Sequence, residues 1–204
     1  MKSIQQDLRE YFEEAKDVYS DAIDAFTKLD REVYSEAKKV RAKAREVNWD
    51  LTNNLLLILS LNQPLMKDLR IVATYLRAVD TVERLIRHAR DIARSDRSLD
   101  ENADQLPSDI VDPVRSMHGS LNALIDITIE CLTNGGEVPA DEVREHWTAV
   151  KTSHAEAVAA LSILKSDTLG GKAMRLEVIN IVSRVDRSAY CLLYTSDAAD
   201  EVDG

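Results

Sequence analysis

The sequence predicts an all-α protein made of two tandem three-helix bundles, and three observations support this fold class. First, the chain of 204 residues is 45% hydrophobic and 30% charged, with only 6 glycines and 4 prolines, a composition that favours helices over strands. Second, long segments carry apolar residues at three- and four-residue steps, the spacing of one helix face. Third, these segments form two similar groups of three.

The first half of the chain contains three such segments. The first spans residues 4–27 and the second spans residues 31–61. Pro64 follows the second segment, and a proline cannot continue a helix but fits the first turn of the next one. We therefore expect the third helix to span residues 65–94, with its apolar face toward the other two.

The second half repeats this pattern. The fourth helix is expected to begin at Asp112, because Pro113 suits the first helical position, and to end before Gly135. The fifth is expected over residues 139–165, and the sixth follows Gly170 and remains amphipathic as far as Tyr190.

The boundary between the repeats is a polar, acidic stretch without periodicity. We place the first repeat at residues 1–97, the linker at 98–109 and the second repeat at 110–190. With an offset of 103 positions, Glu83 of the third helix aligns with Asp186 of the sixth, and the apolar residues around them align as well.

The last segment, residues 191–204, has an unusual sequence. It begins CLLYTSDAAD and resembles a translated adaptor used in sequencing libraries. We therefore interpret residues 191–204 as an artefactual tail and expect the sixth helix to be truncated near Tyr190. The alternative is an ordinary acidic, disordered tail. Resequencing the source DNA past codon 190 distinguishes the two.

Charge and composition exclude several classes of function. The formal net charge of −10 repels nucleic-acid phosphates and anionic lipids, so we expect no nucleic-acid partner. No apolar run is long enough to insert into a membrane. The two cysteines match no zinc or paired-cysteine spacing, and the amino terminus has no apolar signal region. These features favour a cytoplasmic protein.

No catalytic pattern stands out, so we expect no enzymatic activity. None of the four histidines has an acidic residue three positions before it, which a di-iron bundle requires. Neither glycine pair lies in the residue pattern of a phosphate-binding loop.

Residues 30–94 carry a family resemblance. Gln63-Pro-Leu-Met-Lys-Asp-Leu-Arg70 is followed by Glu83-Arg84 and then by His88-Ala-Arg-Asp-Ile-Ala93. These motifs, at this spacing, are similar to those of the PhoU family, and the form around Arg87 resembles archaeal PhoU-like proteins. The resemblance also implies the double three-helix architecture.

The resemblance implies a regulator of phosphate uptake and intracellular phosphate homeostasis. Proteins of this family act with the phosphate ABC transporter, so the implied partner is its ATP-binding subunit or another phosphate-signalling regulator. Arg84 and Trp49 are our candidate partner-binding residues, although Trp49 could instead cover the interface between the repeats. A homodimer is also expected.

Several members of the family bind multinuclear metal clusters through a Glu/Asp-x-x-x-Asp motif in each repeat. Glu83 and Asp186 match the first ligand, but Arg87 and Tyr190 occupy the second position. The alternative function is therefore a metal-binding bundle that holds a divalent or iron ion. The candidate ligands are Asp80, Glu83, Asp91 and Asp186.

A different interpretation of the same residues is a ladder of ion pairs along one helix. Oppositely charged residues four positions apart stabilise a helix by about 0.2–0.5 kcal/mol per pair. The third helix offers three such pairs: Asp80 with Arg84, Glu83 with Arg87, and Arg87 with Asp91. We favour this interpretation over a metal site.

Overall fold

The computed structural model describes residues 2–28, 30, 32–62, 67–96, 106–134, 138–163 and 172–203. Within these ranges the chain is helical except for short connections, which confirms the predicted all-α fold class. The helices are α1 (Lys2–Lys28), α2 (Val33–Asn62), α3 (Lys67–Asp96), α4 (Ser108–Asn134), α5 (Ala140–Ile163) and α6 (Lys172–Asp203). The expected breaks at Pro64, Gly135 and Gly170, and most of the expected linker, lie outside the described residues.

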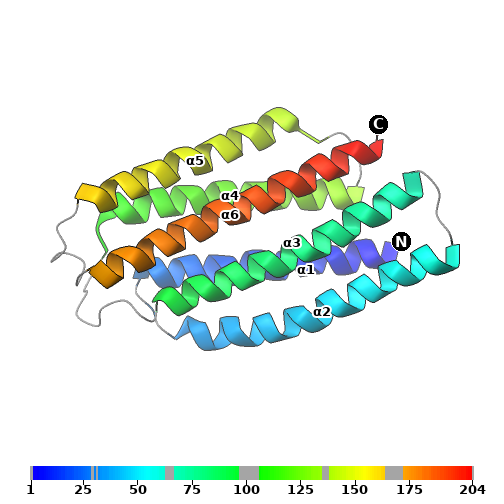
Figure 1. Ribbon diagram of the computed structural model, residues 1–204, viewed down its shortest axis with the longest axis horizontal. Coiled ribbons are helices and arrows are strands. Elements are labelled where there is room, and N and C mark those ends of the chain that lie inside the picture. The colour runs from blue at the N-terminus through cyan, green and yellow to red at the C-terminus, as the bar shows by residue number, and fades with distance from the viewer. Residues whose placement is uncertain are drawn as a thin grey trace.

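The helices form two groups of three that pack side by side (Figure 1). Helices α1, α2 and α3 contact one another, as do α4, α5 and α6. The two groups meet along α3 with α6 and along α1 with α4. Helices α2 and α5 therefore lie on opposite outer edges of the molecule (Figure 1). No described helix is both long enough and apolar enough to cross a membrane.

Helix α1 contributes the large aromatic side chains of the core. Tyr11, Phe12, Tyr19 and Phe26 are all buried, because α1 packs against α2, α3 and α4. Burying each such side chain contributes on the order of 1.5–3 kcal/mol. The regularly spaced apolar residues of α1 are thus buried against neighbouring helices on more than one side.

The start of α4 differs from the expectation. The helix begins at Ser108 rather than Asp112, and Pro113 lies inside it. The carbonyl of Pro107 accepts bonds from the amides of Ile110 and Val111 at 2.9 and 3.1 Å, which closes the first turn. Pro113 removes only one backbone donor, and the burial of Ile110 and Val111 offsets that loss.

The end of α6 also differs from the expectation. The helix does not stop at Tyr190 but continues to Asp203, which contradicts the alternative of a disordered tail, whereas the truncation of the native helix near Tyr190 stays a prediction. Leu192 and Thr195 are fully buried, because the apolar pattern of α6 continues past residue 190. The adaptor origin of residues 191–204 stays a prediction.

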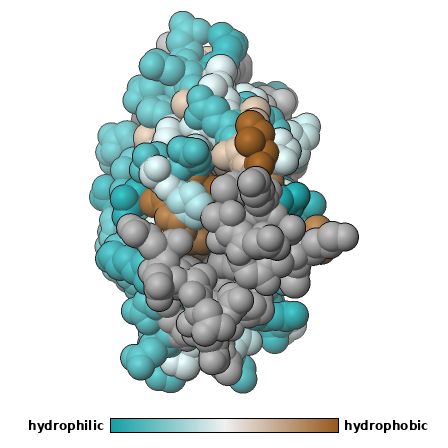
Figure 2. All heavy atoms as spheres, turned by 90° about the vertical axis from the view of Figure 1, so that its left-hand side faces the viewer, coloured by the Kyte–Doolittle hydropathy of each residue, from teal (hydrophilic) through white to brown (hydrophobic). Residues whose placement is uncertain are grey.

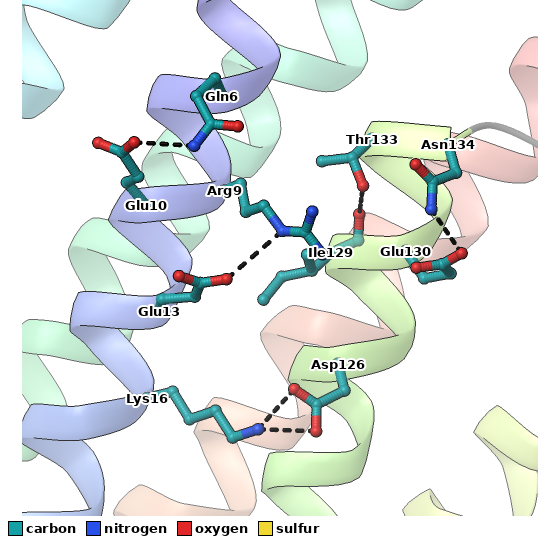
Figure 3. A network of polar contacts seen from close by, with 10 residues as sticks. All are labelled: Gln6, Arg9, Glu10, Glu13, Lys16, Asp126, Ile129, Glu130, Thr133 and Asn134. Atoms are coloured by element: carbon teal, nitrogen blue, oxygen red, sulfur yellow. Dashed lines mark hydrogen bonds and ion pairs between the residues drawn. The ribbon is translucent and has the colours of Figure 1, made fainter.

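The contact between α1 and α4 is one of the two seams between the repeats. Lys16 of α1 reaches Asp126 of α4, with Nζ 2.5 and 2.7 Å from the two carboxylate oxygens (Figure 3). Further polar contacts lie within each helix, such as Arg9 with Glu13 and Asn134 with Glu130 (Figure 3). This seam is therefore joined at its surface by an exposed ion pair, whose contribution is small.

Candidate functional site

The seam between α3 and α6 contains a buried polar cluster. The Ser188 hydroxyl of α6 donates to the carbonyl of Arg184 at 2.9 Å. The same hydroxyl oxygen lies 2.8 Å from Nδ1 of His88 on α3 and 3.0 Å from the hydroxyl of Tyr19 on α1. Since a hydroxyl has only one proton to donate, both His88 and Tyr19 donate to Ser188. Neutral His88 therefore carries its proton on Nδ1.

His88 is held in its neutral form. Burial, together with the nearby guanidinium groups of Arg87 and Arg184, lowers the pKa of its imidazole to about 4, against the opposing effect of Asp91. Burial also raises the pKa of the Tyr19 hydroxyl. The cluster thus consists of uncharged donors and acceptors that join α1, α3 and α6.

One turn beyond His88, Asp91 joins the two repeats by ion pairs. Its Oδ2 accepts a bond of 2.7 Å from Nη1 of Arg184 on α6, and its Oδ1 lies 2.9 Å from Nη2 of Arg90. At the other end of the seam, the buried hydroxyls of Thr81 and Thr195 lie 2.9 Å apart. The antiparallel helices α3 and α6 are therefore linked by polar pairs at several positions along their length (Figure 1).

Glu83 forms an ion pair with Arg41 of α2, and both side chains are nearly buried, with exposed fractions of 17% and 10%. Nε and Nη1 of Arg41 are also buried and have no hydrogen-bond partner among the described residues. Tyr11 lies close by, donates to the carbonyl of Ala44 at 2.9 Å, and has a raised pKa because of burial and the charge of Glu83.

Asp186, the residue of α6 that aligns with Glu83, has an equivalent partner. Lys151 of α5 places Nζ 2.9 Å from its Oδ1 and 3.1 Å from its Oδ2. Lys151 is half exposed and also lies over the ring of Trp147, 4.7 Å from the ring centroid. Trp147 in turn packs against Tyr190, which occupies the second position of the motif.

The predicted ladder of ion pairs on α3 is confirmed in part. Arg84 contacts Asp80 at 2.8 Å, as expected from the four-residue spacing. The other two pairs are wrong, because Glu83 pairs with Arg41 of α2 and Asp91 pairs with Arg90 and with Arg184 of α6. These carboxylates point into seams between helices, where a cation of another helix is closer.

The four candidate metal ligands do not come together. Asp80, Glu83, Asp91 and Asp186 each pair with a lysine or arginine. Among the residues that the structure describes, no group of three or more histidine, cysteine, aspartate or glutamate side chains could hold an ion. Arginine and lysine cannot bind a metal and repel a cation. The side chains present therefore do not fit a metal centre, and metal binding stays a prediction for metal analysis.

Trp49 and Arg84, the candidate partner-binding residues, are both accessible. Trp49 lies on the outer helix α2, and 69% of its surface is exposed. Since α2 contacts α1 and α3, Trp49 does not cover the interface between the repeats. The side chain of Arg84 is 49% exposed. Whether either residue binds a partner stays a prediction.

Sequence reasoning missed the cations that neutralise the motif carboxylates, Arg41 and Lys151, and the hydroxyl of Ser188. A signal for Arg41 exists in the sequence, because Arg41 falls one position after Val40 and next to the apolar stripe of its helix. A charge beside an apolar stripe indicates a side chain at the edge of a seam. Lys151 and Ser188 give no comparable signal.

Comparisons with known proteins agree with this architecture. The PhoU domain family model matches residues 8–95, which confirms the resemblance. No curated protein sequence matches the chain.

Two solved structures share the fold. PhoU from Pseudomonas aeruginosa has a TM-score of 0.83 at 14% identity, over 98% of this chain and 95% of that one. The phosphate transport system regulatory protein PhoU from Streptococcus pneumoniae has a TM-score of 0.84 at 15% identity, over 98% and 93%. The chain is therefore similar to the PhoU domain family over residues 8–95 and has the fold of PhoU proteins across both of its three-helix repeats.

Proposed function

We propose that this protein regulates phosphate uptake and phosphate homeostasis by binding another protein, without catalysis of its own. The observation that supports it is the PhoU domain over residues 8–95 within a chain that has the whole PhoU fold. One of the solved structures with this fold is described as a phosphate transport system regulatory protein. The proposed partner is the cytoplasmic ATP-binding subunit of the phosphate ABC transporter or a phosphate-signalling regulator.

The outer helix α2 offers an accessible surface for such a partner. Trp49, Leu56, Leu57 and Leu61 are exposed to 69%, 48%, 53% and 77%, although they lie in a helix whose other large apolar residues are buried or partly buried. Trp49 and Leu56 are seven residues apart and therefore share one helix face. Exposed tryptophans flanked by apolar side chains are frequent anchors of protein interfaces.

Arg84 of α3 supplies a second type of contact. Its guanidinium is half exposed and held by Asp80 at 2.8 Å, which limits its conformations before binding. An arginine with part of its donors accessible can form paired hydrogen bonds with a carboxylate of a partner. The proposed surface thus combines apolar anchors on α2 with a cation on α3.

A pull-down tests the proposal. The tagged protein is incubated with the purified ATP-binding subunit from the same source, and bound subunit is quantified. Trp49→Ala and Arg84→Ala should each reduce binding at least about tenfold, which corresponds to about 1.4 kcal/mol. Leu176→Ala is the matched control, because Leu176 is 62% exposed on α6 and lies on the other repeat. Equal binding by all variants would refute this surface.

A second measurement tests the role itself. A strain without the gene should lose control of phosphate uptake, and the wild-type gene should restore it while the Trp49→Ala gene does not. Unchanged uptake and unchanged polyphosphate in the deletion strain would contradict a regulatory role.

The predicted homodimer belongs to the same proposal. The exposed apolar residues of α2 could be covered by a second copy instead of a transporter subunit. Light scattering after size-exclusion chromatography measures the mass directly. A dimer that dissociates in Trp49→Ala would assign this face to self-association, and a monomer leaves it available to the transporter subunit.

A further inference from the structure

A polar pocket lies where the carboxyl end of α3 meets the first turns of α6. Its volume is about 450 Å³, and it is lined by Arg90, Asp91, Arg94, Ser95, Glu177, Asn180 and Arg184. Figure 2 views the molecule from the end that contains these turns, and most of the described side chains there are hydrophilic. None of the residues proposed for partner binding lines this pocket.

The arginines of this pocket have donors that the fold does not use. Arg90 and Arg184 each contact Asp91 through a terminal nitrogen, at 2.9 and 2.7 Å. The Nε atoms of both side chains are buried and have no hydrogen-bond partner among the described residues. A buried donor without an acceptor destabilises the fold. The two side chains are nevertheless 24% and 29% exposed, so an oxyanion in the pocket can accept from their accessible N–H groups.

The charge of the pocket differs from that of the rest of the surface. Three arginines face two carboxylates here, whereas the chain as a whole has a formal charge of −10. The groove between α1 and α2, for comparison, is lined by six acidic residues and no basic one. An anion is therefore attracted to this pocket and repelled by that groove.

We propose that this pocket binds a protonated phosphate, either inorganic phosphate or the terminal group of a small phosphomonoester. The arginine N–H groups donate to the anionic oxygens, for which the planar guanidinium is well suited. Glu177 lies on the wall as a carboxylate acceptor. Phosphate at neutral pH retains a proton that such an acceptor can bind, whereas sulfate has none and would only be repelled.

Binding at this position acts on the interface between the repeats. Asp91 and Arg184 join α3 to α6, so an anion that contacts both arginines ties the two bundles together. Such a ligand stabilises the folded chain in proportion to its occupancy. The inference goes beyond the proposed function and does not rest on it, since it concerns the purified protein alone.

Isothermal titration calorimetry at constant ionic strength tests the proposal. Inorganic phosphate should give saturable binding, and sulfate should bind at least about tenfold more weakly, a difference of about 1.4 kcal/mol. Glycerol 3-phosphate distinguishes the two possible ligands. If it binds as tightly as inorganic phosphate, the pocket accepts a phosphomonoester, and if it binds more weakly, the ligand is free phosphate. Both of these results support the site.

Two variants locate the site. Arg94→Gln should weaken phosphate binding at least about tenfold, and Arg94 is exposed, so that the fold should persist. Arg77→Gln is the matched control, because Arg77 is exposed on the same helix and does not line the pocket. Glu177→Gln should reduce the preference for phosphate over sulfate.

Three results would overturn the proposal. The first is no saturable phosphate binding by the wild-type protein at millimolar concentrations. The second is equal binding of sulfate and phosphate, which would indicate attraction by charge alone. The third is equal weakening by Arg77→Gln and Arg94→Gln, measured on variants whose circular dichroism matches that of the wild type.

Discussion

Glu83 in the first repeat and Asp186 in the second occupy equivalent places on α3 and α6, yet their surroundings differ. Glu83 pairs with Arg41, and both side chains are almost removed from solvent. Asp186 pairs with Lys151, whose side chain is 49% exposed. In both cases the cation comes from the middle helix of the same repeat, α2 or α5.

The two ion pairs should therefore differ in how much stability is lost when one partner is removed. Each pair places a cation of the protein beside the carboxylate that would be a metal ligand. A buried pair contributes little net stability, but loss of one partner leaves an uncompensated buried charge. Asp186 is as buried as Glu83, at 18% exposure, but its partner Lys151 is half exposed. Water still solvates that cation when the carboxylate is lost, so the loss costs little. Matched substitutions in the two repeats should therefore have very different effects.

The largest expected effect is that of Glu83→Gln. This change leaves the guanidinium of Arg41 buried without its counterion, although Nε and Nη1 of Arg41 have no hydrogen-bond partner among the described residues. We expect the free energy of unfolding to fall by about 3–5 kcal/mol, measured by urea denaturation. The double variant Glu83→Gln with Arg41→Met should recover much of that loss, since no buried charge remains. A Glu83→Gln protein as stable as the wild type would show that water reaches this pair.

The second prediction concerns the packing of α6 after Tyr190. Leu192 is fully buried, so Leu192→Ala should cost about 2–5 kcal/mol. Leu176→Ala on the same helix, at 62% exposure, should change stability by less than about 0.5 kcal/mol. Equal stability of the two variants in urea denaturation would mean that the segment after Tyr190 does not pack as described.

The third prediction concerns the pH dependence of stability. The pKa of His88 is lowered to about 4 by burial and neighbouring arginines, whereas its value in an unfolded chain is about 6.5. Below pH ~6.5 the unfolded state therefore binds a proton that the folded state does not, and stability falls as the pH decreases to about 4. The loss reaches about 3 kcal/mol and then levels off.

The contribution of His88 is isolated by comparison with His88→Gln. The variant should lack this part of the pH dependence between about pH 6.5 and 4, while the carboxylates titrate similarly in both proteins. Urea denaturation at several pH values measures the difference. Parallel stability curves for the two proteins would contradict a neutral, buried His88.

The sequence predicted the helices better than the contacts between them. Apolar residues at three- and four-residue steps determine which face of a helix is buried, and that information is local. The partner of Glu83 depends instead on how α2 faces α3, so spacing along α3 wrongly suggested Arg87. The start of α4 was predicted wrongly for a similar reason. Pro113 locally indicates the first turn of a helix, but the burial of Ile110 and Val111 extends α4 back to Ser108. The pocket at Arg90 and Arg184 combines residues 94 positions apart, which no local pattern reveals.

The smallest expected effect is that of Asp186→Asn, the counterpart of Glu83→Gln. Lys151 is half exposed and keeps its contact with the ring of Trp147, so water and the ring solvate its charge when the carboxylate is lost. We expect a loss of at most about 1 kcal/mol, measured under the same urea conditions, and a decrease of this loss in high salt. A loss as large as that of Glu83→Gln would mean that Asp186 has a structural role beyond its pair with Lys151. The two repeats would then be equivalent in energetics as well as in position.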